Sequence, residues 1–160
     1  MSWARVDAIA THRAIRVDDD ELSGTYTYRS FLDNPAPVDD FNTLRFAQLE
    51  LQLSLQSDGT ITGDLASTRA QPWVMVITGT VSASSLTHFR LTGKGRPNTA
   101  IADFHYEYDG MVLAHWETKV GQRTTLAGTV LRAADHGSGV DPARAGQTAS
   151  FLAVKRDSSA

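Results

Sequence analysis

The chain has 160 residues, 41% of them hydrophobic, with a formal net charge of −3 and no cysteine. This length suits a single domain with one sizeable core. The slightly acidic balance excludes the basic surface that attracts nucleic acids or anionic lipids, and the missing cysteines exclude disulfides, thiolate nucleophiles and cysteine-bound metals.

Residues 1–20 carry charged side chains throughout and lack the apolar stretch of a signal peptide. No segment approaches the ~20 apolar residues that a membrane-spanning helix needs. We therefore expect a soluble, cytoplasmic protein. The apolar residues of 1–20 recur at loosely helical spacing, which predicts a short helical or irregular arm, followed by one β domain over 21–157 and a tail over 158–160.

From Leu22 onward the hydrophobic period is two and turn signals are frequent, which is typical of an antiparallel all-β domain. The clearest strand is "LELQLSLQ" (49–56), whose leucines share one face while its polar residues share the other. Leu44 and Phe46 have the opposite parity. One face can stay buried only if an extra residue is inserted, so we predict a β-bulge near Ala47.

The turn "SDG" (57–59) has a predictable length because the flanking faces must match. A two-residue loop would pair Leu55 with Thr62 and mix apolar with polar residues. A three-residue loop, with Gly59 in the left-handed conformation, pairs Leu55 with Ile61. The second register is therefore predicted.

The same reasoning applied to "DFHYEYDGMVLAHWE" (103–117) predicts a hairpin with the turn Tyr108–Asp109–Gly110. One face then collects Phe104, Tyr106, Val112, Ala114 and Trp116, and the other collects Asp103, His105, Glu107, His115 and Glu117. In this hairpin Asp103 lies opposite His115, with His105 within diagonal reach.

Further strands are predicted at 73–82, 86–94, 123–133 and 147–156, which makes nine strand-like segments in all. A closed meander needs an even number, so eight strands form the barrel and the ninth is an edge strand or half of a bent one. Segments 73–82 and 147–156 are apolar on both faces, as expected where both sides are covered or where one side meets another subunit.

A short glycine pattern recurs as "LSGT" at 22, "ITGD" at 61, "ITGT" at 77, "LTGK" at 91 and "LAGT" at 126. Glycine weakens a strand interior, so its repeated use indicates bends or close backbone approaches in a coiled sheet or small barrel, unless the repetition is coincidental. The fold class predicted is a single antiparallel up-and-down β-barrel.

The strings "LSGTY", "DGTITGDL" and "VITGTV" resemble the strand pattern of avidin-type proteins and of small calycin barrels in general, over about 22–95. The resemblance implies an eight-stranded up-and-down barrel that holds one small ligand at one end. The chain departs from avidin at "DNPAPVDDFN" (33–42) and in its tryptophans, and no ligand residue can be matched. Biotin binding is therefore not implied.

Consecutive pairing of nine strands places the connections 33–42, 68–72, 94–99 and 119–122 at one end. Their charged residues form a rim around a mouth, with 33–42 as a candidate lid. The rim residues are Asp33, Asp39, Asp40, Arg69, Lys94, Arg96, Lys119 and Arg123. The loop 134–146 is assigned to the opposite end, with His136 as an exposed turn residue.

Three functions remain open. The leading hypothesis is binding of a small, partly apolar ligand in the lumen; its expected contacts are Trp73, Phe104, Tyr106 and Trp116. The second is a cofactor-free isomerase or cyclase in which His105 or His115 moves a proton and Asp103 orients it, provided that their face points inward rather than toward solvent. The third is an ancillary oligomerising module that uses the strands apolar on both faces.

No metal or cofactor is predicted. His105, His115 and a carboxylate are acceptable metal ligands, but their spacing is not diagnostic, and no nucleophile-elbow or phosphate-binding motif is present. The expected partners are a small-molecule ligand and, under the third hypothesis, a second copy of the chain; nucleic acid and membrane are not expected.

Overall fold

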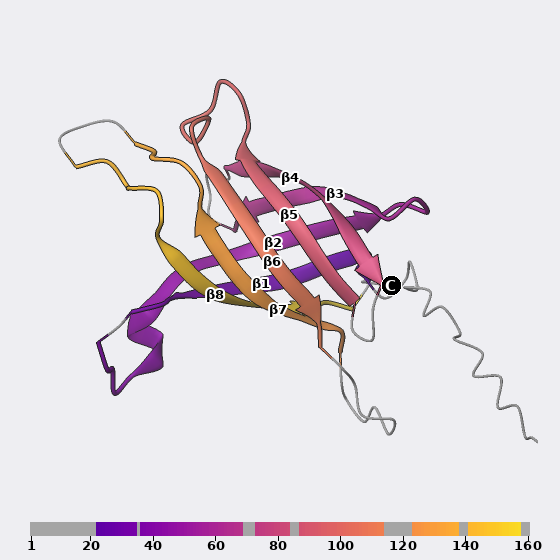
Figure 1. The fold of residues 1–160 in the computed structure, drawn as a ribbon, viewed down its shortest axis with the longest axis horizontal. Coiled ribbons are helices and arrows are strands. Elements are labelled where there is room, and N and C mark those ends of the chain that lie inside the picture. The colour runs from indigo at the N-terminus through magenta and orange to yellow at the C-terminus, as the bar shows by residue number, and fades with distance from the viewer. Residues whose placement is uncertain are drawn as a thin grey trace, which may run out of the picture.

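In the computed structural model, eight antiparallel strands close into a barrel in which each strand pairs with its neighbours in the chain (Figure 1). The structure describes residues 22–34, 36–68, 73–83, 87–113, 123–137 and 141–157. The strands are β1 (Gly24–Leu32), β2 (Arg45–Leu55), β3 (Thr60–Ser67), β4 (Val74–Ala83), β5 (Thr87–Gly95), β6 (His105–Val112), β7 (Thr125–Arg132) and β8 (Thr148–Lys155). A 3-10 turn, η1 (Phe41–Leu44), precedes β2. The predicted all-β, up-and-down barrel is confirmed, while the predicted arm and tail lie outside the described residues.

The register of β2 and β3 is the predicted one. Leu55 pairs with Ile61, and Leu51 pairs with Leu65. Gly59 has a φ of +84°, the left-handed conformation that a three-residue loop requires at this position. The need to keep the leucines on one face thus determines both the loop length and the pairing.

The predicted bulge in β2 is also confirmed and falls at Phe46. Ser30 pairs with Ala47 and Phe31 pairs with Arg45, so the register shifts between the two pairs and leaves Phe46 without a partner on β1. Beyond the bulge the leucines of β2 are buried inside the barrel. Because of the extra residue, both Phe46 and Ala47 line the lumen.

The hairpin predicted around Gly110 is wrong. β6 continues through Asp109 and Gly110, and Gly110 pairs with Phe89 on β5 and with Gly128 on β7. A Cβ at Gly110 would lie 2.6 Å from Cζ of Phe89, so the glycine makes room for a buried ring rather than a turn. The prediction divided 103–117 into two strands at this turn. Because β6 runs through the turn as one strand, the count falls from nine strands to eight.

Within β6 the predicted face assignment holds, because a continuous strand preserves the same alternation; Ala114, His115, Trp116 and Glu117 lie outside the described residues. Tyr106 and Val112 point into the core, joined by Tyr108, which the predicted turn had excluded. His105 and Glu107 lie on the outer face.

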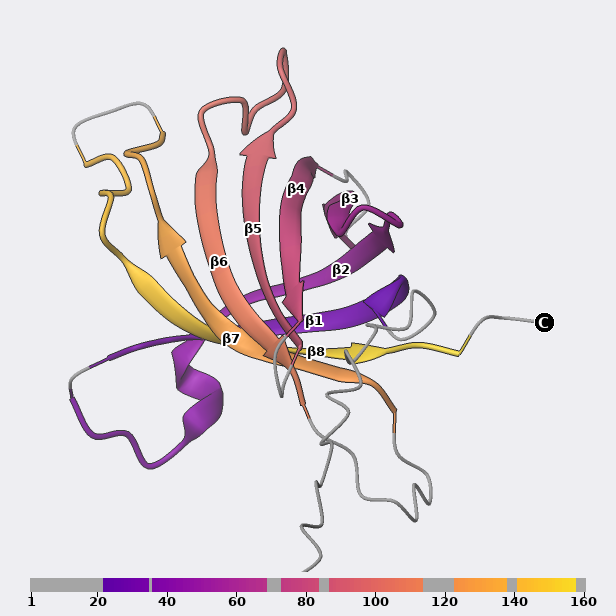
Figure 2. The same cartoon turned by 45° about the vertical axis from the view of Figure 1, so that its right-hand side comes forward.

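The loss of one strand moves every later connection to the other end of the barrel. The connection 133–147 now lies at the same end as 33–44, 68–73 and 96–104, which we call the mouth end. Figure 2 shows the connection 96–104 and the described residues 133–137 and 141–147 extending from this end. Arg123 lies at the opposite end, where it pairs with Asp157, so its assignment to the rim is corrected. Arg69 and Lys119 fall in ranges that the structure does not describe.

Side chains fill the half of the barrel away from the mouth. The ring of Phe151 lies 5.5 Å from that of Tyr28, 6.4 Å from that of Phe89 and 6.1 Å from that of Tyr108. Together with Leu51, Leu65, Ile77 and Leu91, these rings leave only about 10 Å³ of free space. This half is therefore a closed floor of close-packed side chains.

Strand glycines allow the close approaches that the sequence pattern predicted. A Cβ at Gly63 would lie 1.9 Å from the carbonyl oxygen of Gln52, and one at Gly79 would lie 2.0 Å from that of Arg90. No side chain fits at these distances. The strands can thus coil tightly enough to close a small barrel.

The outer face carries exposed apolar side chains on both of the strands predicted to be apolar on two faces. Leu152 and Val154 on β8 are 46% and 42% exposed, and Val76 on β4 is 40% exposed. The homo-oligomer expected from these strands stays a prediction. In the described ranges, no helix has the length and apolarity needed to cross a membrane, and the cytoplasmic location likewise stays a prediction.

Candidate functional site

The mouth-side half of the lumen contains a cavity of about 240 Å³. Aliphatic and aromatic side chains form most of its wall, with a few polar groups among them. The lining residues are Tyr28, Ser30, Phe46, Ala47, Leu49, Leu65, Trp73, Met75, Phe104, Tyr106, Tyr108, Val130, Arg132 and His136. A mostly apolar concave wall with few polar groups is typical of small-molecule sites.

Aromatic rings from separate parts of the chain meet around the cavity. The ring of Phe104 lies 6.2 Å from Trp73 and 6.1 Å from Tyr106, and Phe46 lies 6.4 Å from Tyr106. The structure thus brings together Trp73, Phe104 and Tyr106, three of the four predicted lining residues. Their contact with a ligand stays a prediction, and Trp116 lies outside the described part of the chain.

Two polar side chains of the wall meet at the hydroxyl of Tyr106. Nε2 of His136 lies 2.8 Å from this oxygen, and Nε of Arg132 donates to it at 3.4 Å. The His136 ring also packs on Phe104, with centroids 3.9 Å apart. The residues that sequence reasoning had left out of the site, Arg132 and His136, therefore form its polar edge.

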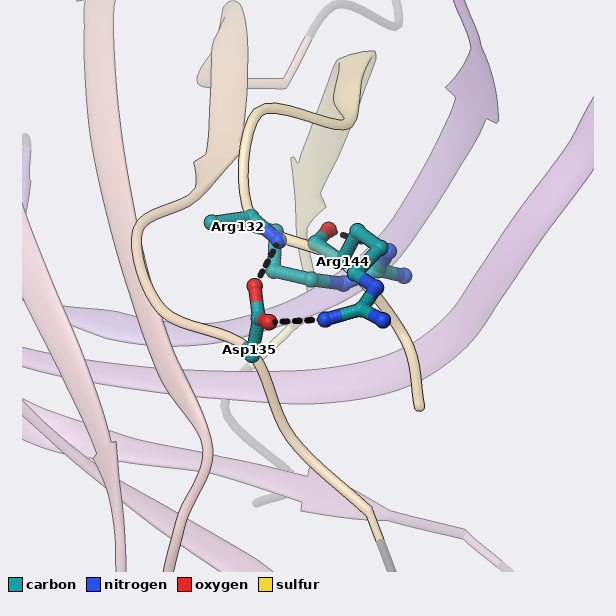
Figure 3. A network of polar contacts seen from close by, with 4 residues as sticks. Arg132, Asp135 and Arg144 are labelled. Atoms are coloured by element: carbon teal, nitrogen blue, oxygen red, sulfur yellow. Dashed lines mark hydrogen bonds and ion pairs between the residues drawn. The ribbon is translucent and has the colours of Figure 1, made fainter. Parts of the chain in front are cut away.

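Hydrogen bonds of the Asp135 and Asp103 side chains hold the loop that carries His136 in place. The Asp135 carboxylate accepts from Arg144 at 2.9 Å and from the backbone N–H of Ala145 at 2.7 Å (Figure 3). These two contacts hold the pKa of Asp135 below its usual value, with the backbone hydrogen bond as the larger cause. Asp103 accepts from the N–H of Gly137 at 2.7 Å and links this loop to the connection before β6.

Besides Tyr106, three buried residues of the wall carry hydroxyl groups. Burial raises the pKa of both Tyr28 and Tyr108 far above the usual tyrosine range, so both phenols stay neutral. Ser30 is fully buried, and its Oγ forms no hydrogen bond within the part of the chain that the structure describes. Its neighbour is the Tyr28 hydroxyl: Ser30 lowers the pKa of Tyr28 against the larger effect of burial, although the contact does not have the geometry of an ordinary hydrogen bond.

The predicted acid-base set does not assemble on the lumen. His105 lies on the outer face, with Nε2 2.7 Å from Oε1 of Glu107, because its parity on β6 is opposite to that of Tyr106. Asp103 precedes the strand and bonds the loop at Gly137. His115 lies in a range that is not described. Among the described residues no group of three His, Asp or Glu side chains could hold a metal ion.

Arg132 and His136 carried a signal that the wrong strand count concealed. Arg132 shares the inward parity of Leu126 and Val130 on β7, which predicts that it faces the lumen. His136 follows four residues later, in the loop that the nine-strand count placed at the far end. A single continuous β6 would have brought both residues to the mouth.

His136 should titrate below the ordinary histidine value. Burial lowers its pKa most, Arg132 lowers it further, and Asp103 and Asp135 partly oppose them. The pKa of the folded protein is thus below that of the unfolded chain. The contacts of His136 therefore contribute fully to folding stability at pH values above the pKa of the unfolded chain. This contribution is lost as the pH falls from that pKa through the pKa of the folded protein.

Ring-nitrogen NMR chemical shifts of His136 provide the measurement. We expect a midpoint below 6.5, the ordinary histidine pKa. Asp103→Asn should lower it further, because it removes a charge but keeps an oxygen acceptor for Gly137. Arg132→Met should raise it. A midpoint above the ordinary value, or a shift in either variant in the direction opposite to the one expected for it, would contradict this geometry.

No family model, curated protein or solved structure matches this chain. The resemblance to avidin-type and calycin barrels therefore stays a prediction. The function has to be inferred from the cavity and its wall.

Proposed function

We propose that the protein binds one small, largely apolar molecule in the mouth-side half of its lumen. The observation that carries this proposal is the contrast between the two halves of one barrel, with about 240 Å³ free at the mouth and about 10 Å³ at the floor. Protein interiors are normally close-packed, and empty apolar space lowers stability. A ligand that fills the mouth-side half accounts for why only the floor is packed.

The volume limits the size of the ligand. An apolar cavity of about 150 Å³ holds benzene, so by the same ratio the 240 Å³ found here suits an apolar body of roughly ten non-hydrogen atoms. Sites for drug-sized ligands are usually larger, about 300 to 1,000 Å³. The rings of Phe46, Trp73 and Phe104 favour a flat or branched body, for which aromatic contacts provide stabilisation.

Acid-base catalysis by Asp103 and the two histidines is not part of this proposal. It required the polar face of β6 to point inward, and His105 points outward toward Glu107. Binding needs only the wall that the described residues form.

Indole is a suitable first probe, because it is neutral, flat, apolar and soluble. We expect saturable binding by calorimetry, with amide NMR shifts confined to lumen positions such as Ala47, Met75 and Val130. Thr78 and Thr129, which are exposed on the outer face of β4 and β7, serve as internal controls. No saturable binding, or shifts only on the outer face, would overturn the proposal.

A further inference from the structure

The cavity contains an arginine without a carboxylate partner. Outside the cavity, Arg90, Arg96, Arg123, Arg144 and Arg156 each pair with an Asp or Glu, while Arg29 bonds the backbone oxygen of Tyr28 and Arg45 faces Gln48. Arg132 lines the lumen instead, and among the described residues no carboxylate oxygen lies within 4.0 Å of it. A cation on an apolar wall is costly unless something compensates it.

The bonds that Arg132 does make all go to neutral oxygens. Nε donates to the Tyr106 hydroxyl at 3.4 Å, and Nη1 donates to the carbonyl oxygen of Arg144 at 3.0 Å. Nη2 makes no hydrogen bond within the described ranges. The guanidinium carbon lies 5.8 Å from the ring centre of Phe46 and 6.0 Å from that of Tyr106, within cation–π range. The side chain is thus positioned by its neighbours while part of its donor set stays unused.

The nearest acidic groups are engaged elsewhere. Asp135 hydrogen-bonds Arg144 and the N–H of Ala145 and interacts with Arg132 only electrostatically, while Asp103 accepts from the N–H of Gly137; both carboxylates are exposed. After burial, Arg132 is the second cause that holds the pKa of His136 below its usual value, so the charge of the arginine is felt at the edge of the cavity.

A second group in the wall independently indicates a polar atom in the ligand. The hydroxyl of Ser30 is fully buried, lines the same cavity and lacks a hydrogen-bond partner among the described residues. A buried, unsatisfied hydroxyl costs stability, and a ligand oxygen inside the cavity would satisfy it.

We propose that the ligand is a small amphipathic carboxylate, with its apolar body against the aromatic wall and its carboxylate on the guanidinium of Arg132. This rests on the proposed function, since it assumes that the lumen binds a ligand. Arginine suits a planar carboxylate because its fork of N–H groups matches the two oxygens. In an apolar site partly shielded from water such a charge-assisted contact is stronger than at the open surface.

Three naphthalene derivatives of similar shape test the charge: 2-naphthoate, its neutral amide 2-naphthamide, and the cation 2-naphthylmethylammonium. Calorimetry at neutral pH should give the order acid, then amide, then ammonium. The acid should bind about tenfold tighter than the amide, the margin expected when a neutral hydrogen bond becomes charge-assisted. Arg132→Met should reduce the acid to the affinity of the amide, whereas Arg132→Lys should keep part of the preference.

Arg90→Met is the matched control, because it removes the same charge from the outer surface and should leave the preference unchanged. The order of affinities for the three compounds is measured on the unaltered protein, so this part of the test does not depend on whether a variant folds. Equal affinity for acid and amide, or a preference that survives Arg132→Met, would overturn the carboxylate proposal while leaving lumen binding intact. If none of the three binds while indole does, the carboxylate proposal fails alone; if indole also fails, lumen binding fails with it.

Discussion

Replacing Val130 with tryptophan is expected to weaken indole binding by about a hundredfold or more. Val130 lies on β7, is 2% exposed and lines the cavity, so the larger side chain would occupy the space that the ligand needs. An aromatic group of this size buries about 150 to 250 Å², worth roughly 4 to 6 kcal/mol before the costs of association. Loss of most of that burial leaves little affinity.

Thr129→Trp is the control for this variant. Thr129 is the preceding residue on the same strand and is exposed on the outer face, so an identical ring there leaves the lumen unchanged. Calorimetry on both variants should show binding lost only in Val130→Trp. Because the cavity has room for the new ring, the free energy of unfolding of the Val130→Trp protein should fall by less than the ~1 to 3 kcal/mol typical of an overpacked core. Equal indole affinity in the two variants would mean that indole binds elsewhere.

Gly79→Ala is expected to lower the free energy of unfolding by about 3 kcal/mol or more, which would be among the larger effects of a single substitution. A Cβ at this position would lie 2.0 Å from the carbonyl oxygen of Arg90 and 2.9 Å from Cα of Leu91. These are backbone atoms of the neighbouring strand, so relief requires moving β4 away from β5. The pairing between the two strands would be disturbed along its length.

Thr80→Ala is the matched comparison, since Thr80 follows on the same strand and is exposed. Its effect should stay within about 0.5 kcal/mol, as is usual for surface positions. Urea denaturation of both variants measures the difference. A Gly79→Ala protein as stable as Thr80→Ala would show that the strands do not approach as closely as the structure has them.

Much of the fold could be predicted because a buried face constrains the residues on it. The alternating leucines of β2 determined its register with β3, the three-residue turn at Gly59 and the bulge at Phe46. In each case a slip by one residue would have exposed the apolar set, so a local pattern was sufficient.

Gly110 shows where local patterns stop being sufficient. "YDG" is a strong turn signal, but this glycine is needed because the ring of Phe89, on the neighbouring strand, lies where its Cβ would be. That contact joins residues distant in the sequence, so no property of 103–117 alone could reveal it. The same limit hid the meeting of His136 with Phe104 and Tyr106.

The aromatic wall could be anticipated and its polar edge could not. Tyr106 and Phe104 were predicted from strand parity, which is a local property. The contact between Arg132 and Tyr106, and the burial of Ser30 without a partner, depend on how the closed barrel places β7, β6 and β1 around one space.

Crystallography under xenon pressure would test most directly that the mouth-side half of the lumen is open apolar space, since xenon enters such cavities without needing polar contacts. We expect xenon between Leu49, Met75 and Val130, and none at the packed floor around Phe89 and Phe151. A lumen filled by side chains along its whole length, with no xenon at the mouth, would contradict the proposed binding site and the ligand inferred from it.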